Sequence, residues 1–278
     1  MGGRTRRTGR LAPTPSGRLH LGNALSFGVA WLSARQAGAH LVLRIEDVDT
    51  TRARPALEAA IRDDLRWLGL SWDEETPRQS QRHYGPWLDR LDTYRCICTR
   101  KLLAQRPCPC GEADHPDGAV RWRRPDGAVA FLDRRWGLQL VDPSEHGDPV
   151  LVRRDGVANY LLAVVVDDLR DGVTEVVRGA DLLPFTAIQV RLWEALGAVP
   201  PTWLHAPLLL GPDGRKLSKS HQSTEVAALR AGGWTPQAVW RLLLPFVGIR
   251  GVETLAEAVP HFAPTAGEQG PIVLDTAD

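Results

Sequence analysis

Apolar residues at helical and at strand-like spacing alternate along the first part of the chain. Residues 19–37 are predicted to form a helix, because apolar side chains recur there at helical spacing, at Leu21, Leu25, Val29 and Leu32. The apolar run Leu41–Ile45 ends in two acidic residues, as expected for a buried parallel strand that leads into a loop. A second helix is predicted from Pro55 to Gly69.

This succession of strand, helix, strand and helix predicts an α/β fold with a Rossmann-type, doubly wound core around a parallel sheet. In such folds ligands bind at the carboxyl ends of the strands. We therefore expect the loop Arg10–Ser16, which follows a short apolar start, and the side chain of Glu46 to belong to a binding site.

The composition and the hydrophobic pattern of the chain change twice after residue 94. All four cysteines and several Pro and Gly clusters lie between residues 95 and 150, which predicts a small insertion between two halves of the core. After residue 223 helical periodicity is convincing only over Pro236–Phe246. The predicted domains are 1–94 and 151–222 for the two halves of the core, 95–150 for the insert and 223–278 for a short helical tail.

Several elements are predicted within the later part of the chain. Two strand-like runs, Ala128–Leu132 and Gly137–Val141, lie in the insert. Strand character is expected from Val150 to Val166. Asp167 and Asp168 are expected in a turn at the strand end, and a functional carboxylate pair is the alternative. A helix is expected over Leu182–Leu196, and a strand over Trp203–Leu210.

Composition and charge add few constraints. The chain has 278 residues, of which 43% are hydrophobic and 24% charged, as in an ordinary globular protein with a substantial core. The basic N-terminus lacks the apolar segment of a signal peptide, and no apolar run approaches the roughly 20 residues that span a bilayer. We therefore expect a cytoplasmic monomer without a membrane partner. With a net charge of +1, a nucleic acid would have to be bound by a local basic surface.

The stretch RLAPTPSGRLHLGN, residues 10–23, predicts a strand, a tight loop and a helix start. The first amides of that helix have no partner within the helix and favour an anion. Neither the Walker A nor the GxGxxG pattern is present. His20 in the first turn offers a donor to a phosphate, and Gly22 allows a flat ligand to approach the backbone. The structural alternative is a Pro/Gly turn with a helix-capping histidine.

A second stretch, GPDGRKLSKS at residues 211–220, contains two of the three lysines of the chain. Arginine is otherwise the basic residue of this sequence, so Lys216 and Lys219 in one loop require an explanation. An ammonium on a flexible stem can follow a phosphate that moves during a reaction. A solvated basic loop is the alternative.

The cysteines form two CxC pairs, Cys96 with Cys98 and Cys108 with Cys110. Four thiolates at short spacing in a chain expected in the cytoplasm favour one structural, tetrahedral Zn²⁺ site over disulfides. The alternatives are a site that uses His115 as a ligand and no metal at all.

HLGN at residues 20–23 and KLSKS at residues 216–220 resemble the HIGH and KMSKS signatures of class I aminoacyl-tRNA synthetases. LRIEDVDTTR, from Leu43, and NYLLAVVVDDLRDGVTEVVRGADLL, from Asn159, are similar to the glutamyl-tRNA synthetase branch. Within this branch the chain resembles the family of short paralogues that attach glutamate to queuosine in tRNA(Asp). The resemblance extends from Gly9 to Ser220, most of the chain.

The resemblance implies the substrates L-glutamate and ATP, the latter with Mg²⁺ to offset its charge. The implied glutamate-binding residues are Arg10, Ala12, Thr14, Glu46, Tyr160 and Arg178. The implied ATP-binding residues are Pro13, His20, Gly22, Asn23 and Lys219, and the implied catalytic residues are His20, Lys216 and Lys219. Glu46 would take the ammonium and the arginines the two carboxylates, in either pairing. Alternatives are a salt bridge from Arg178 to Asp181 and a core position for Tyr160.

The implied acceptor is the anticodon arm of tRNA(Asp). The 58 residues after Ser220 are too few for the anticodon-binding domain of full-length glutamyl-tRNA synthetases. Two departures from the family pattern are Asn23 in place of the second histidine and the CxC spacing after Cys98. Three alternatives are an amino-acid ligase with a small-molecule amine acceptor, a non-catalytic tRNA-binding module and a conventional synthetase, which the length disfavours.

Overall fold

The structure is a computed structural model that describes residues 6–51, 53–106, 108–112, 115–211, 214, 224–265, 267 and 270–273, without the side chains of residues 100, 112, 145 and 146. Within these residues no helix combines the length and the apolar character needed to cross a membrane.

The first half of the core is a parallel sheet of β1 (Thr8–Leu11), β2 (His40–Leu43) and β3 (Glu74–Glu75), in the order β1-β2-β3. The crossovers contain α1 (Leu21–Gln36) and α2 (Pro55–Trp67). Pro55 begins α2, where its missing N–H is not needed. The predicted strand–helix–strand–helix succession is confirmed.

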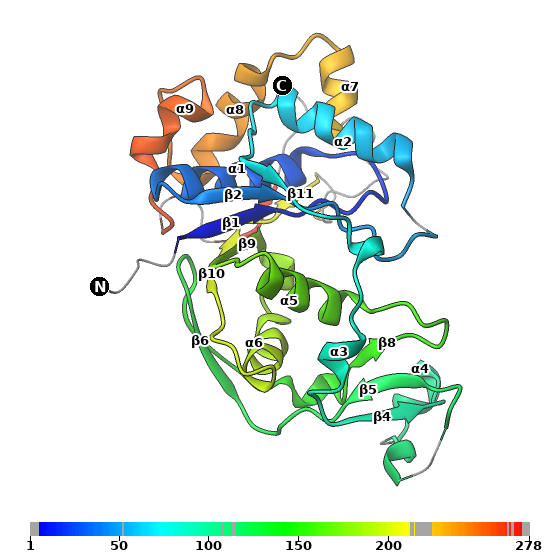
Figure 1. Ribbon diagram of the computed structural model, residues 1–278. Coiled ribbons are helices and arrows are strands. Elements are labelled where there is room, and N and C mark those ends of the chain that lie inside the picture. Colours follow the sequence, from blue (N-terminus) through cyan, green and yellow to red (C-terminus); the bar gives the residue numbers. More distant parts are fainter. Residues whose placement is uncertain are drawn as a thin grey trace.

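The second half of the core is a separate four-stranded sheet that lies beside the first (Figure 1). β9 (Glu175–Gly179) and β10 (Thr202–Ala206) are parallel, and the hairpin of β6 (Val129–Asp133) and β7 (Gly137–Val141) extends them in the order β7-β6-β10-β9. β1 lies beside β9, where the amide of Thr174 donates to the carbonyl of Thr8 at 2.9 Å. The doubly wound α/β class is thus confirmed, and the two strand-like runs of the predicted insert form a hairpin at the edge of this sheet.

Helices cover both sides of the sheet (Figure 1). α1 and α2 lie on one side with the C-terminal helices α7 (Val226–Ala231), α8 (Pro236–Leu243) and α9 (Leu255–Ala258). α5 (Tyr160–Arg170) and α6 (Thr186–Ala195) lie on the other side. The tail therefore contains helices besides the predicted one at 236–246, which is divided into α8 and a 3₁₀ turn, η6 (Leu244–Val247).

The prediction of a strand from Val150 to Val166 was wrong. Strand β8 ends at Val152, and helix α5 begins at Tyr160. Every residue from Leu162 to Asp168 is buried, so the apolar run lacks the amphipathic period that would have indicated a helix. Asp167 and Asp168 consequently lie inside α5 rather than in a strand-end turn, and both form buried ion pairs.

The remaining strands form two small sheets. In the insert β4 (Thr93–Cys96), β5 (Ala119–Trp122) and β8 (Val150–Val152) are antiparallel in the order β4-β5-β8. β11 (Leu209–Leu210) pairs with β12 (Ile272–Val273). The short helices are α3 (Gly85–Leu88), α4 (Arg100–Leu103), η1 (Gln79–Gln81), η2 (Cys110–Glu112), η3 (Pro143–His146), η4 (Ala180–Leu182) and η7 (Val259–His261). The domain boundaries at 94, 150 and 222 stay a prediction.

Candidate active site

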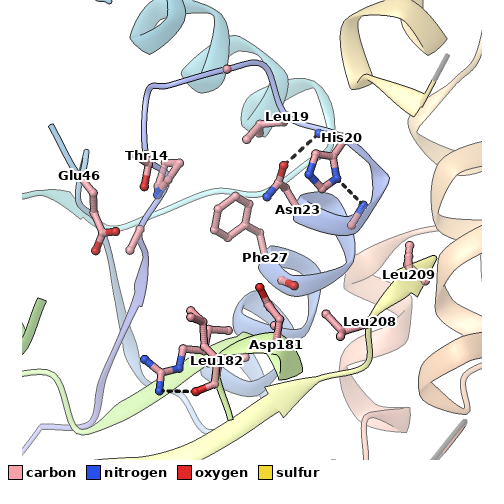
Figure 2. A pocket seen from close by; sticks show the side chains of 18 of the residues that line it. Thr14, Leu19, His20, Asn23, Phe27, Glu46, Asp181, Leu182, Leu208 and Leu209 are labelled. Atoms are coloured by element: carbon pink, nitrogen blue, oxygen red, sulfur yellow. Dashed lines mark hydrogen bonds between the residues drawn. The ribbon is translucent and has the colours of Figure 1, made fainter. Parts of the chain in front are cut away.

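A cavity of about 490 Å³ lies where β1, β2 and β9 reach their carboxyl ends. Its walls include residues from both halves of the chain (Figure 2). Ten of the predicted site residues line it: Arg10, Ala12, Pro13, Thr14, His20, Gly22, Asn23, Glu46, Tyr160 and Arg178. The structure thus brings these residues together, whereas Lys216 and Lys219 lie outside the described residues.

The charged groups of the cavity are buried. Arg10 is 4% exposed, Arg178 and Glu46 each 7%. Burial raises the pKa of Glu46, against the opposing charges of Arg44 and Arg10, and burial lowers the pKa of Arg178. Two guanidinium groups and one carboxylate are complementary to a ligand that carries two carboxylates and one ammonium.

Backbone carbonyls help to orient the two arginines. Arg10 Nη1 donates to the carbonyl of Val177 at 2.6 Å, and Arg178 Nη2 donates to the carbonyl of Leu182 at 3.3 Å. Asp181, the partner considered for Arg178, also lines the cavity. Tyr160 lines it too and is 38% exposed, which excludes a core position for this tyrosine.

A buried ion-pair network behind the cavity was not predicted from sequence. The Arg44 side chain is fully buried, and its Nη2 lies 2.7 Å from Asp168 Oδ1 and 3.4 Å from Glu46 Oε1. Its Nη1 lies 3.0 Å from Asp171 Oδ2. Burial alone would lower the pKa of Arg44, but these carboxylates raise it well above its ordinary value. Asp168 also lies 3.4 Å from Arg10 Nε, so the network connects Glu46 to Arg10.

His20 and Asn23 build the start of α1 at the opposite end of the cavity from Glu46 (Figure 2). His20 Nδ1 accepts the amide of Gly22 at 3.1 Å, and Asn23 Oδ1 accepts the amide of His20 at 3.1 Å. Together these bonds form a capping box, so the helix-capping alternative for His20 describes its geometry. The neutral ring then carries its proton on Nε2. A Cβ at Gly22 would lie 3.0 Å from two atoms of the His20 ring, so the glycine makes room for this arrangement.

The two ends of the lysine loop meet the same cavity. Leu208 and Leu209 line its wall before the loop begins. Beyond the loop, the amide of Val226 donates to the carbonyl of Leu19 at 2.9 Å, and Glu225 forms an isolated β-bridge with His20. The described residues before the segment with Lys216 and Lys219 thus line the cavity, and those after it contact Leu19 and His20, which also line it.

A second, larger cavity of about 1210 Å³ separates the insert from α5 and α6. Tyr160 and Leu182 line both cavities. Three arginines line the second cavity: Arg106, Arg121 and Arg123. Phe185, 46% exposed, contributes an aromatic face to it. Asp148 lines it as well, so the surface beside the first cavity is basic on balance and partly aromatic.

The four cysteines form one cluster whose sulfur atoms lie within 4.8 Å of one another. Cys96 Sγ and Cys98 Sγ lie 3.4 and 3.8 Å from Cys108 Sγ, and Cys98 Sγ lies 3.6 Å from Cys110 Sγ. Zn–S distances of about 2.3 Å in a tetrahedron require sulfur atoms about 3.8 Å apart. The cluster therefore fits a zinc site. Among the described residues this metal-ligating group consists of the cysteines, without His115.

The fold and the site define the catalytic domain of a class I aminoacyl-tRNA synthetase. The features that do so are the doubly wound parallel core, the helix that starts with HLGN at the cavity, and the inserted cysteine cluster. More particularly, the chain belongs to the family of class I tRNA synthetases (E and Q), catalytic domain, whose model matches residues 7–107 and 111–258. The resemblance inferred from the motifs is confirmed.

Relatives of known name agree with this assignment. The glutamyl-Q tRNA(Asp) synthetase of Nitratidesulfovibrio vulgaris is 44% identical over 308 residues, which cover 97% of this chain and 92% of the relative. The glutamyl-Q tRNA(Asp) synthetase of Deinococcus radiodurans is 41% identical, over 94% of this chain and 96% of the relative. The crystal structure of glutamate-tRNA synthetase from Elizabethkingia anophelis superposes with a TM-score of 0.84 at 25% identity, covering 98% of this chain and 68% of that one.

Proposed function

We propose that this protein activates L-glutamate with ATP and transfers the glutamyl group to the queuosine base in the anticodon of tRNA(Asp). The observation that carries the proposal is the single cavity in which Arg10, Arg178 and Glu46 face the start of α1 at His20. One end of this cavity suits an amino acid with two carboxylates, and the other suits a phosphate.

Glutamate is bound by charge complementarity in this scheme. Glu46 receives the ammonium, and the two guanidinium groups receive the carboxylates by charge-assisted hydrogen bonds. Tyr160 adds a hydroxyl at the mouth of the cavity, while Ala12 and Thr14 line its wall. A glutamine side chain would leave one arginine without a counter-charge, so the site favours glutamate.

ATP occupies the other end. In this scheme the start of α1 and the Nε2–H of His20 bind its phosphates, and Pro13, Gly22 and Asn23 complete that part of the wall. ATP enters as its Mg²⁺ complex. Lys216 and Lys219, on the loop whose ends meet this cavity, follow the charge as it moves to pyrophosphate.

The chemistry requires positioning and charge stabilisation rather than a side-chain nucleophile. A carboxylate oxygen of glutamate attacks the α-phosphorus of ATP, the bond to pyrophosphate breaks, and glutamyl-adenylate forms. A hydroxyl oxygen of the acceptor then attacks the glutamyl carbonyl carbon and forms an ester. AMP leaves with the electron pair of the broken C–O bond, and the proton of the hydroxyl passes to solvent.

The acceptor approaches through the second cavity in this proposal. Its arginines suit phosphates, and the exposed ring of Phe185 suits a base that has left its stack. Tyr160 and Leu182 at the boundary of both cavities connect the acceptor to the activated glutamate.

Cys96, Cys98, Cys108 and Cys110 would hold a structural Zn²⁺. All four positions of a tetrahedral ion would be filled by thiolates, so the metal would cross-link the insert and would offer no open position for catalysis.

The first test is ATP–pyrophosphate exchange with glutamate, aspartate and glutamine, in the presence and absence of tRNA. Exchange with glutamate alone is expected. No exchange with any of these amino acids, even with tRNA, would leave only the non-catalytic tRNA-binding module.

The second test is transfer of labelled glutamate to tRNA(Asp) that carries queuosine, with the same tRNA carrying guanosine as the matched control. Transfer to the queuosine form alone is expected. Label on a small amine, without RNA binding that weakens as salt is raised, would instead favour the amino-acid ligase.

The lysine loop is tested by Lys219→Ala. Because an ammonium that follows the moving phosphate acts mainly in the transition state, the rate of activation should fall while glutamate affinity stays nearly unchanged. A parallel loss of rate and glutamate affinity would contradict this role for Lys219.

A further inference from the structure

His205 and Asp133 form a buried pair behind the glutamate cavity, and neither lines it. His205 lies in β10, in register with Arg178 on the neighbouring strand β9. His205 is 0% exposed and Asp133, at the end of β6, is 1% exposed. The pair is therefore shielded from solvent and in contact with one of the two arginines of the cavity.

The hydrogen bonds of this pair have a defined direction. Arg178 Nε lies 3.0 Å from His205 Nε2, and an arginine N–H can only donate. His205 Nε2 must therefore accept, which places the ring proton on Nδ1. Nδ1 lies 2.7 Å from Asp133 Oδ2 and donates to it. The result is a chain from carboxylate through neutral imidazole to guanidinium.

Charge and burial support the neutral form of the ring. Arg178, Asp133 and, farther away, Arg10 are the charged groups that act on His205, while Thr186 and Trp203 contact it without charge. Burial lowers the pKa of His205, and the positive charge of Arg178 lowers it further, while the hydrogen bond to Asp133 opposes both effects without reversing them.

The other oxygen of Asp133 is also occupied. Oδ1 accepts the amides of Arg135 and Trp136, each at 2.9 Å, in the turn between β6 and β7. Trp136 Nε1 in turn donates to the carbonyl of His205 at 2.9 Å. The edge hairpin thus fixes the orientation of the carboxylate that selects the tautomer of His205.

Two further donors of Arg178 are fixed from α6. Nη1 donates to Gln189 Oε1 at 2.6 Å, and Nη2 donates to Thr186 Oγ1 at 2.9 Å. These bonds hold the nitrogens at the far end of the guanidinium, and the imidazole is the hydrogen-bond acceptor for Nε.

We propose that His205 is a positioning residue, oriented by Asp133, that holds the Arg178 guanidinium in the geometry required to bind a substrate carboxylate. The inference rests on the proposed function for the identity of the substrate. It adds a role for two buried residues in its recognition.

Asp133→Asn is the decisive variant, because it is isosteric and reverses the hydrogen bonding. The two turn amides require an oxygen, so the new amide nitrogen must face His205 Nδ1. The ring would then carry its proton on Nε2 and oppose the N–H of Arg178, as in other Asp-to-Asn changes beside a histidine. We expect the KM for glutamate to rise about 10–100-fold, with the KM for ATP unchanged.

His205→Gln and His205→Leu form the matched pair. The glutamine oxygen can still accept from Arg178 Nε, so His205→Gln should keep the glutamate KM within a few-fold of the value for the unmodified protein. His205→Leu has no acceptor and should raise the glutamate KM as much as Asp133→Asn does. If Asp133→Asn does not fold, this pair alone decides. Equal glutamate KM for the Gln and Leu variants would overturn the proposal.

¹⁵N NMR of the histidine rings tests the tautomer without any activity. The signal of the His205 ring is identified by its absence from the spectrum of His205→Gln. We expect this ring to be protonated on Nδ1 in the unmodified protein and on Nε2 in Asp133→Asn. A ring protonated on Nε2 in the unmodified protein would refute the proposal. Failure of the proposed function would instead show as absent exchange in the unmodified protein with the Nδ1 signal intact.

Discussion

Replacing Arg44 by methionine should strongly destabilise the fold, because it removes the central cation of a buried network. Arg44 contacts Asp168, Asp171 and Glu46 at 2.7, 3.0 and 3.4 Å, and its own side chain is fully buried. Methionine is close in length but leaves these carboxylates without their shared partner. Breaking a buried pair on one side costs about 3–5 kcal/mol, and we expect the free energy of unfolding to fall by that amount at pH 7.

The pH dependence gives this prediction a second signature. Without Arg44, the pKa of the buried carboxylates should rise, as burial already raises the pKa of Glu46. The folded state then takes up protons more readily than the unfolded state as the pH falls. The deficit of Arg44→Met relative to the unmodified protein should therefore shrink between pH 7 and pH 5.

Urea unfolding at both pH values measures the effect, with Arg241→Met as the control. Arg241 pairs with Glu253 at 2.9 Å, but the two side chains are 67% and 65% exposed. Such a surface pair contributes about 0–1 kcal/mol. A loss at Arg44 no greater than at Arg241, or a deficit that does not change with pH, would refute the reasoning.

Three further predictions concern other parts of the molecule. Purified protein should contain one zinc per chain, and Cys98→Ser should release most of it to a chromogenic chelator and expose the insert to protease. Burial raises the pKa of Asp64 to about 6, so the folded state binds an extra proton between about pH 4 and 6 and stability falls as the pH rises through this window. Asp64→Asn should remove that fall and, after allowance for solvent screening, stabilise the protein at pH 7 by roughly 1–2 kcal/mol in urea unfolding. Gly28→Ala should destabilise by about 1–3 kcal/mol, because its Cβ would lie 2.7 Å from the Trp240 ring.

Each of these has an outcome that would contradict it. Zinc that stays bound in Cys98→Ser would exclude this sulfur as a ligand. An Asp64→Asn variant with the pH dependence of the unmodified protein would show that this carboxyl does not titrate near pH 6. A stabilised Gly28→Ala would show that helix propensity outweighs the contact between α1 and α8.

Local sequence patterns were sufficient to predict the first half of the core and the residues at one end of the cavity. Alternating strand and helix periods placed Arg10 and Glu46 at strand ends, where the cavity lies. The CxC pairs likewise gave the cysteine cluster from spacing alone. Arg178 and Tyr160 came only from the family resemblance, because no local pattern distinguishes them from packing residues.

What the sequence did not reveal depends on long-range contacts. Arg44 and Asp168 are 124 residues apart, and nothing in either segment indicates the other. The signal that could have been used is the pair of acids inside an apolar run, which is costly unless cations are nearby. The same apolar run also prevented the prediction of α5, since a helix that is buried on all sides has no polar face and therefore no amphipathic period.

The contact between β1 and β9 has a consequence for biosynthesis. Arg10 is held by the carbonyl of Val177, 167 residues later in the chain. At about 5–20 residues per second, a ribosome would take roughly 10–30 s to make the intervening segment. Until then the edge of β1 lacks β9, and Arg10 lacks the carbonyl of Val177. Such an exposed strand edge favours binding by chaperones. Amino-acid binding should therefore arise late, when β9 comes to lie beside β1.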